Sequence, residues 1–229
     1  MKKTTEHFIE ISNISKDYSS GDTTVSAIHH MDFCIEDGEF VSIMGQSGSG
    51  KSTLLSIMGG LNHPTQGAVY VDTMDVYALS NEQRADFRSE YVGIIFQSYQ
   101  LIPFLTVLEN VRLPLAITKF KEKLQNEMAL SVLDQVGLVD KAHRLPDQLS
   151  GGEQERVAIA RAIVNKPPIL LADEPTGNLD TKTAMDIMNT LQSLNEEGLT
   201  IIMVTHNPDL CRFSGRTIHV RDGQCHYDA

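Results

Sequence analysis

Residues 45–53, GQSGSGKST, combine glycines, hydroxyl side chains and one lysine at a spacing that suits phosphate binding. The pattern G-x-x-x-x-G-K-S follows an apolar run at residues 40–44 and precedes an apolar helix pattern, the context in which this motif holds nucleotide phosphates. Its glycines let consecutive backbone N–H groups turn toward phosphate oxygens, and the positive end of the following helix favours the anion. We assign phosphate contacts to the whole loop: Gly45, Gln46, Ser47, Gly48, Ser49, Gly50, Lys51, Ser52 and Thr53.

Three side chains of this loop have separate tasks. Lys51 supplies a point charge for the β- and γ-phosphates, Ser52 places its hydroxyl on Mg²⁺, and Thr53 steadies the phosphates from the next helical position. The alternative interpretation is a glycine-rich turn between a strand and a helix, with a lysine that meets no ligand. We favour the phosphate loop because both flanking patterns are present.

Two adjacent carboxylates end the apolar run ILLADEP at residues 169–175. Open α/β sheets place ligand-handling residues at the ends of such strands. We expect Asp173 to hold Mg²⁺, directly or through water, and Glu174 to lean toward a water in line with the γ-phosphate as general base. Two solvated acids at a strand end are the alternative.

A second glycine loop, LSGGEQERV from residue 149, precedes a helix pattern but carries no lysine. The first loop already forms a complete phosphate cradle, so a second helix start in the same compact chain cannot easily reach the same phosphate. If two copies meet head to tail, Ser150, Gly151 and Gly152 of one copy face the nucleotide held by the other. The spacing of Ser150 and Glu153 also matches a helix capping box, which requires no ligand but is compatible with one.

The composition of the 229-residue chain limits the classes of protein it can represent. It is 41% hydrophobic and 21% charged, and no stretch approaches the roughly 18 apolar residues of a membrane helix. We therefore expect no direct membrane insertion, no secretory signal and an address on the cytoplasmic side. A net charge of −11 argues against sequence-blind nucleic-acid binding, and three scattered cysteines do not form a disulfide framework or a zinc motif with paired ligand spacing.

The chain changes character twice along its length. From residue 8 to about 71, short β-rich runs alternate with turn signals, whereas the pattern from about 81 to 165 is helical. The apolar runs at 169–172 and 200–205 are typical of parallel strands buried on both faces, and a helix candidate at 183–195 separates them. Each motif occurs once, so we expect one α/β unit with a helical insertion.

The order and spacing of these motifs resemble the nucleotide-binding domain of ATP-binding cassette (ABC) transporters over nearly the whole chain. The matching residues are 45–52, Gln97, 149–154, Asp173, Glu174, 178–180 and His206. The stretches LADEPTGNLD, MGQSGSGKSTLLSIMGGL and LIPFLTVLENVRLPL are similar to the LolD/MacB group of that family. Glu153 and Glu155 depart from the glutamines that are frequent in relatives, which we expect to affect only local capping.

The resemblance implies a fold and a division of the chain. The fold is α/β, with a P-loop NTPase (RecA-like) core, an N-terminal antiparallel β-subdomain and an inserted α-helical subdomain. Residues 1–229 then form one ABC ATPase domain, in which 1–96 and 166–229 are the catalytic core with the β-subdomain. Residues 97–165 are the helical subdomain that carries the Ser-Gly-Gly loop.

The resemblance also implies roles for residues that carry no motif of their own. Tyr18 matches the aromatic that stacks on adenine, and Gln97 matches the glutamine that senses Mg²⁺ and the attacking water. His206 matches the histidine that contacts the γ-phosphate and orients Glu174, and Asp180 matches a residue that communicates across the dimer. The alternatives are a plain strand tyrosine and a structural histidine at a strand end.

Together these roles imply an ATPase of the translocase class, with ATP and Mg²⁺ as its ligands. It forms a homodimer on ATP binding and drives a separate permease of the MacB, LolC or FtsX type from the cytoplasmic side of the inner membrane. The apolar stretch Leu101–Val111 is expected to receive a helix of that permease, or else to be ordinary core. The implied task is export of lipoproteins, peptides or macrolide-like compounds, or transmission of force.

A soluble P-loop ATPase without a transport function is the alternative. Nucleotide kinases and GTPases lack a counterpart of LSGGE, and the guanine-reading motif N-K-x-D is absent from this sequence. DNA-repair relatives insert long coiled coils or zinc modules, for which 229 residues leave no room.

Overall fold

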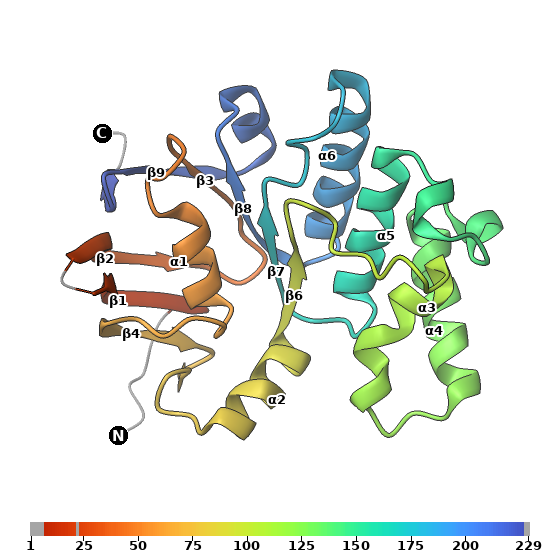
Figure 1. Cartoon of the computed structure of the whole chain (residues 1–229), viewed down its shortest axis with the longest axis horizontal. Helices are drawn as coiled ribbons and strands as arrows, with labels where there is room; N and C mark the ends of the chain where they lie inside the picture. Colours follow the sequence, from red (N-terminus) through yellow and green to blue (C-terminus); the bar gives the residue numbers. More distant parts are fainter. Residues whose placement is uncertain (1–6, 22, 227–229) are drawn as a thin grey trace.

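Two β-sheets of different character lie side by side in the computed structural model, which describes residues 7–21 and 23–226 (Figure 1). The smaller sheet is antiparallel with strand order β2-β1-β4-β5. Its strands are β1 (Ile9–Ser20), β2 (Thr23–Ile35), β4 (Gln66–Val71) and β5 (Met74–Asp75). Alternate residues such as Ile9, Ile11 and Ile35 are buried, as expected for strands that pack one face on a core.

The larger sheet has the order β10-β9-β3-β8-β7-β6 and is parallel except for β10. Its strands are β3 (Phe40–Met44), β6 (Val92–Ile95), β7 (Ile169–Asp173), β8 (Thr200–Thr205), β9 (Arg216–Arg221) and β10 (Gln224–His226). Every residue of β8 is buried, which confirms that this apolar run lies between two packed faces.

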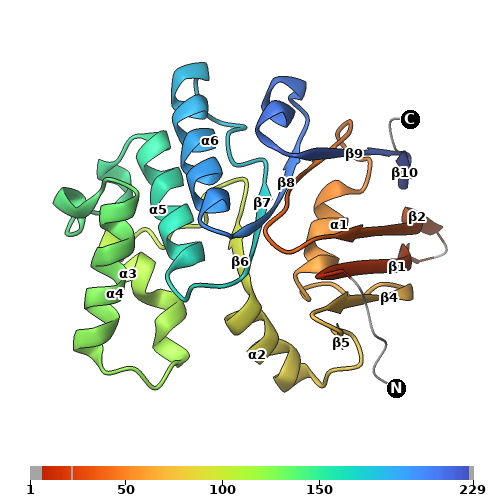
Figure 2. The ribbon, with the colours of Figure 1, turned by 180° about the vertical axis from the view of Figure 1, so that it is seen from behind.

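Helices cover both sides of the parallel sheet, as Figures 1 and 2 show from opposite directions. The helix α1 (Lys51–Met58) packs between the two sheets, in a core shared with the antiparallel strands. On the other side α5 (Gly151–Ile163) and α6 (Thr181–Glu196) lie side by side, with α3 (Val107–Arg112) and α4 (Glu122–Gln135) beyond α5. These helices and the sheet share a second core. The helix α2 (Asn81–Tyr91) leads into β6.

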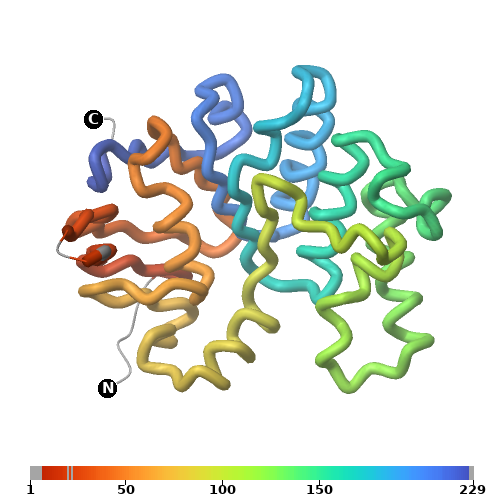
Figure 3. The backbone as a smooth tube through the Cα atoms, in the orientation of Figure 1, coloured from red at the N-terminus to blue at the C-terminus, as the bar shows by residue number. Residues whose placement is uncertain are grey.

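The tube in Figure 3 shows how the chain leaves the parallel sheet after β6, forms α3, α4 and α5, and returns at β7. Short 3₁₀ turns at Leu113–Ile117, Val139–Lys141 and Pro146–Gln148 connect these helices. The strand β6 interrupts the stretch from 81 to 165 that the sequence pattern predicts to be helical. It is four residues long and includes Gly93, so it is too short to show a distinct periodicity.

The predicted α/β class with an antiparallel lobe is confirmed, and the elements between residues 97 and 165 are helical throughout that fully described range. Within the described part of the chain, no helix is both long enough and apolar enough to span a bilayer. The strands β3, β8, β7 and β6 are parallel neighbours, so their carboxyl ends lie at the same edge of the sheet, where the candidate site lies.

Candidate functional site

The glycine loop between β3 and α1 adopts a backbone shape that depends on its glycines. Gly48 and Gly50 have φ angles of 80° and 99°, which are open to glycine and strained for other residues. A Cβ atom on Gly45 would lie 2.1 Å from the carbonyl oxygen of Val220. Because α1 begins at Lys51, its first backbone N–H groups face the loop and can meet an anion there.

Lys51 and Ser52 bring a cation and a hydroxyl to the strand ends. The Lys51 side chain is buried and its Nζ donates to the Gln46 carbonyl oxygen over 2.8 Å. Burial lowers the pKa of Lys51, while Glu174 and Asp173 act in the opposite direction. Ser52 Oγ donates to Asp173 Oδ1 over 3.0 Å, and burial raises the pKa of Asp173 against the effect of that hydrogen bond. A buried ammonium beside two oxygen ligands fits a phosphate chain that carries Mg²⁺.

Glu174 is held at both of its carboxylate oxygens. Its Oε2 accepts from Gln97 Nε2 over 3.1 Å, and its Oε1 lies 3.1 Å from His206 Nδ1. The backbone of Glu174 is in the left-handed region at φ 49°, and its N–H donates to the Val204 carbonyl oxygen. Because a left-handed conformation is uncommon for glutamate, the turn after β7 fixes where this carboxylate points.

Most of these groups line one cavity of about 850 Å³, whereas Asp173 is not among its lining residues and is linked to it through the hydrogen bond from Ser52. The sequence-predicted residues that line it are Gly45, Gln46, Ser47, Gly48, Gly50, Lys51, Ser52, Thr53, Gln97, Glu174 and His206. Ala27 and Pro208 also line it, although their apolar side chains give no signal of chemistry in the sequence. Ser49 is buried instead, and its hydroxyl has no hydrogen-bond partner among the described residues.

The Ser-Gly-Gly loop starts α5 and stands outside this cavity. Ser150 Oγ accepts from the Glu153 N–H, and the Ser150 N–H donates to Glu153 Oε2 over 2.9 Å, which confirms the predicted capping box. Glu153 also pairs with Lys141, and these hydrogen bonds lower its pKa to about 2. Ser150 is exposed to solvent. Gly151 is half-buried and Gly152 is buried beside Thr183, so the loop is open to a ligand or to a second chain at Ser150.

Asp180 and Tyr18 likewise lie outside the residues that line the cavity. Asp180 caps α6 by accepting from the N–H groups of Lys182 and Thr183, and the hydrogen bonds from Thr183 lower its pKa. Tyr18 is 43% exposed on β1, where its hydroxyl accepts from Asn62 Nδ2 over 2.6 Å. Lys16 Nζ lies 4.9 Å from the centre of the Tyr18 ring, and the contact of this ring with adenine stays a prediction.

Glu155 lies in a buried environment that the sequence pattern does not predict. It is 1% exposed within α5, and its Oε1 has no hydrogen-bond partner among the described residues. Burial raises the pKa of Glu155 to about 8 against the effect of Arg161, whose guanidinium donates to the carbonyl oxygens of Tyr99 and Gln100. Arg161 thereby ties α5 to the segment that follows Gln97. The departure from glutamine at this position affects the interior of α5 and not its cap.

The motifs found here agree with a comparison to known protein families. A family model described as ABC transporter matches residues 28–177, a span that includes Lys51, Ser150 and Glu174. The chain belongs to the ABC transporter family. As a member of that family it is an ATP-binding cassette, and the expected P-loop NTPase fold is confirmed.

Curated relatives of this cassette extend over almost its whole length. An ABC transporter ATP-binding protein of Methanocaldococcus jannaschii, MJ1508, is 47% identical and covers 94% of this chain and 96% of its own. The lipoprotein-releasing system ATP-binding protein LolD of Geobacter metallireducens is 43% identical with the same coverage. The macrolide export ATP-binding/permease protein MacB of Chlorobium phaeobacteroides is 45% identical, but the match covers 33% of that longer protein. The predicted similarity to the LolD/MacB group is confirmed.

Solved structures of cassettes share the fold closely. The dimeric structure of the bacterial ABC transporter cassette MJ0796 has a TM-score of 0.88, is 45% identical, and covers 95% of this chain and 96% of its own. A dimeric post-hydrolysis state of MJ0796 bound to ADP and Pi has a TM-score of 0.89 at 43% identity, with 96% and 97% coverage. Both neighbours are dimers of cassettes.

Proposed function

We propose that this cassette hydrolyses ATP with Mg²⁺ and powers a separate membrane permease. The observation that carries the proposal is the placement of Glu174 between Gln97 and His206, at the edge of the cavity that Lys51 and Ser52 line. A carboxylate held at both oxygens beside a phosphate loop is arranged to accept a proton from an attacking water. Relatives named as transporter ATP-binding proteins support the coupling to transport.

In this proposal the side chains of the site divide the tasks of binding and hydrolysis among them. Lys51 and the N–H groups of the loop bind the β- and γ-phosphates, and Ser52 and Asp173 hold Mg²⁺, with Gln97 beside them as its sensor. Mg²⁺ would neutralise charge that develops on the phosphate oxygens. Glu174 takes the proton of the water, while His206 orients Glu174 and contacts the γ-phosphate. Tyr18 stacks on the adenine.

The complete site needs a second copy of the chain in this proposal. Ser150, Gly151 and Gly152 of one copy close over the γ-phosphate bound by its partner, and Asp180 communicates across the same interface. Support comes from the exposed position of Ser150 outside the cavity of its own chain and from the dimeric relatives. Binding of two ATP molecules then joins the copies, and hydrolysis loosens them because the shared phosphate is released.

The permease docks on the helical region of residues 97–165, which we propose as a subdomain separate from the core formed by residues 1–96 and 166–229. The predicted stretch Leu101–Val111 divides in two: Val107 and Val111 are buried in the core, whereas Phe104 is 81% exposed. A hollow of about 180 Å³ lined in part by Phe96, Pro114 and Arg161 lies on the edge formed by β6 and α5. A short amphipathic helix of a permease fits such a surface.

The proposed cargo follows from the relatives. LolD belongs by name to a lipoprotein-releasing system and MacB to macrolide export. We therefore propose that the cassette drives export of lipoproteins, peptides or macrolide-like compounds, or transmits force. It would act from the cytoplasmic side of the inner membrane. Purification of the cassette from its own cell membrane should bring down a permease of the MacB, LolC or FtsX type. A cassette that hydrolyses ATP and enriches no membrane protein over a Phe104→Ser chain would favour the soluble ATPase instead.

A further inference from the structure

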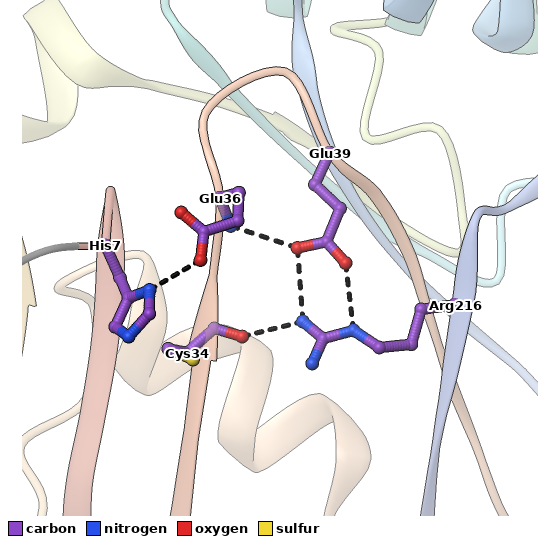
Figure 4. Close-up of polar contacts among 5 residues, drawn as sticks. All are labelled: His7, Cys34, Glu36, Glu39 and Arg216. Carbon is purple, nitrogen blue, oxygen red and sulfur yellow. Dashed lines mark hydrogen bonds and ion pairs between the residues drawn. The ribbon is translucent and has the colours of Figure 1, made fainter.

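Three metal-ligating side chains of different chemistry meet on the antiparallel lobe (Figure 4), where Cys34 lies on the face of β2 opposite the buried Phe33 and Ile35. One imidazole nitrogen of His7, the sulfur of Cys34 and a carboxylate oxygen of Glu36 all lie within 4.8 Å of one another. Cys34 and Glu36 are two residues apart in an extended segment, so they share a face, while Ile35 between them is buried. His7 precedes β1, which pairs with β2, and its Nδ1 lies 2.5 Å from Glu36 Oε1.

The backbone beneath this cluster is anchored by one ion pair. Arg216 Nε and Nη2 donate to the two carboxylate oxygens of Glu39 over 2.8 and 3.1 Å. The Glu36 N–H donates to Glu39 over 3.0 Å, and Arg216 Nη2 also donates to the Cys34 carbonyl oxygen over 2.7 Å. Figure 4 shows that these bonds use the main chain of Cys34 and Glu36. The turn is therefore fixed through main-chain bonds, which leave the Cys34 thiol available, while the Glu36 carboxylate pairs with His7.

We propose that His7, Cys34 and Glu36 bind one Zn²⁺-type cation. Sulfur, imidazole nitrogen and carboxylate oxygen are the three ligand types that Zn²⁺ combines, whereas Mg²⁺ and Ca²⁺ prefer oxygen alone. Bond lengths of about 2.0 to 2.3 Å place zinc ligands roughly 3.3 to 3.8 Å apart. Ligand atoms at the 4.8 Å limit must therefore close by about 1 Å, whereas His7 Nδ1 and Glu36 Oε1, now 2.5 Å apart, must separate by about 1 Å. His7 and Glu36 have 38% and 57% exposed side chains and can rotate that far.

The open fourth position takes water, and the cation joins the segment that precedes β1 to the end of β2 and the turn after it. Formation of the metal–sulfur bond releases the thiol proton of Cys34 to water, with no change in oxidation state. This site lies outside the residues that line the nucleotide cavity. Binding of the cation is expected to raise the melting temperature of the lobe, and it should not require ATP.

Co²⁺ titration of the untagged, metal-stripped chain under reducing conditions tests the proposal, with Mg²⁺ in excess and nucleotide omitted. One equivalent of Co²⁺ should produce a thiolate-to-cobalt charge-transfer band that Zn²⁺ removes by displacement. Cys34→Ser should abolish the band, whereas Cys211→Ser and Cys225→Ser, which lie outside the cluster, should keep it. His7→Gln and Glu36→Gln should each weaken Zn²⁺ binding by about tenfold or more.

Absence of the band, its persistence in Cys34→Ser, or unchanged Zn²⁺ affinity in both His7→Gln and Glu36→Gln would overturn the site. Circular dichroism of each variant at 25 °C separates loss of a ligand from loss of the fold. The ATP-hydrolysis proposal does not depend on this result, because none of the three ligands lines the nucleotide cavity.

Discussion

Gln97 Nε2 donates to Glu174 Oε2 over 3.1 Å, although the two residues are 77 positions apart in the chain. Gln97 follows β6 and Glu174 follows β7, and these strands are neighbours in the parallel sheet. The main-chain carbonyl oxygen of Gln97 accepts from Asn178 Nδ2 over 3.1 Å. The hydrogen bond thus joins the proposed general base to the segment that leads into the helical region, where we propose that the permease docks.

Replacement of Glu174 by Gln should abolish hydrolysis while ATP binding is retained. The amide keeps the size of the side chain but cannot accept the proton of water, so the turnover rate should fall by about 10²- to 10⁴-fold. Steady-state phosphate release and equilibrium binding of a fluorescent ATP analogue measure the two properties. Glu90→Gln, on the exposed face of α2, is the matched control. Hydrolysis by Glu174→Gln at the wild-type rate would contradict the role of Glu174 as general base.

Mixing two inactive variants should restore part of the activity. A Lys51→Ala chain lacks the phosphate cation and a Ser150→Arg chain blocks the second loop, so neither homodimer has a complete site. A heterodimer has one complete site, and an equal mixture should recover about a quarter of the wild-type sites. Phosphate release across a range of mixing ratios checks this. If either variant alone keeps wild-type activity, or if no mixture regains any, the shared site is wrong.

Phe104→Ser should uncouple the cassette from its permease and leave the rate of the isolated cassette unchanged. The side chain is 81% exposed, so its removal costs little folding stability, whereas an apolar anchor in an interface is worth up to several kcal/mol. Comparison of ATPase rates with and without the permease in lipid discs measures the effect. Leu130→Ser, at 36% exposure on α4, is a control on the same helical region. If the permease stimulates Phe104→Ser and wild type equally, the docking surface does not include Phe104.

Glu155 should make folding stability depend on pH in an unusual direction. Its pKa is about 8 in the folded chain and 4.5 when unperturbed, so between these values the folded chain holds a proton that the unfolded chain has lost. Stability therefore falls as pH rises through this window and levels off above about pH 8. The change is on the order of a few kcal/mol. Burial is the main cause of this raised pKa, and the charge of Arg161 opposes it.

Urea unfolding of wild type and Glu155→Gln at about pH 5 and about pH 8.5 checks the sign. The amide does not ionise, so the two chains should be similar at the lower pH, and the variant should be the more stable at the higher pH. Glu153→Gln is the contrasting control, because the low pKa of Glu153 contributes stability above pH 4.5 that is lost on acidification toward about pH 2. If the stability of wild type and of Glu155→Gln changes with pH in parallel, the raised pKa of Glu155 is contradicted.

The parts of the fold and site that depend on local pattern were accessible from the sequence. The phosphate loop needs glycine where φ is positive or a neighbour is close, and Gly45, Gly48 and Gly50 meet those demands. The capping box at Ser150 follows from residue types three positions apart. The helix predicted at 183–195 begins two residues earlier in the structure because Asp180 caps it.

The parts that depend on distant contacts were not accessible. Ala27 reaches the cavity because β2 crosses the loop, where its carbonyl oxygen would lie 2.4 Å from a Cβ on Gly50. In the sequence, Glu155 resembles any charged residue of an amphipathic helix. Its burial results from tertiary packing around α5, which the local sequence does not specify. The short strand β6 is defined by its pairing with β7 rather than by its own periodicity.

The most direct test of the shared site is a crystal structure of the Glu174→Gln chain grown with ATP and Mg²⁺. The account predicts a two-fold dimer with two nucleotides, each lying between Lys51 of one protomer and Ser150 of its partner. A nucleotide bound at Lys51 with the Ser150 loops of every protomer facing solvent would contradict it.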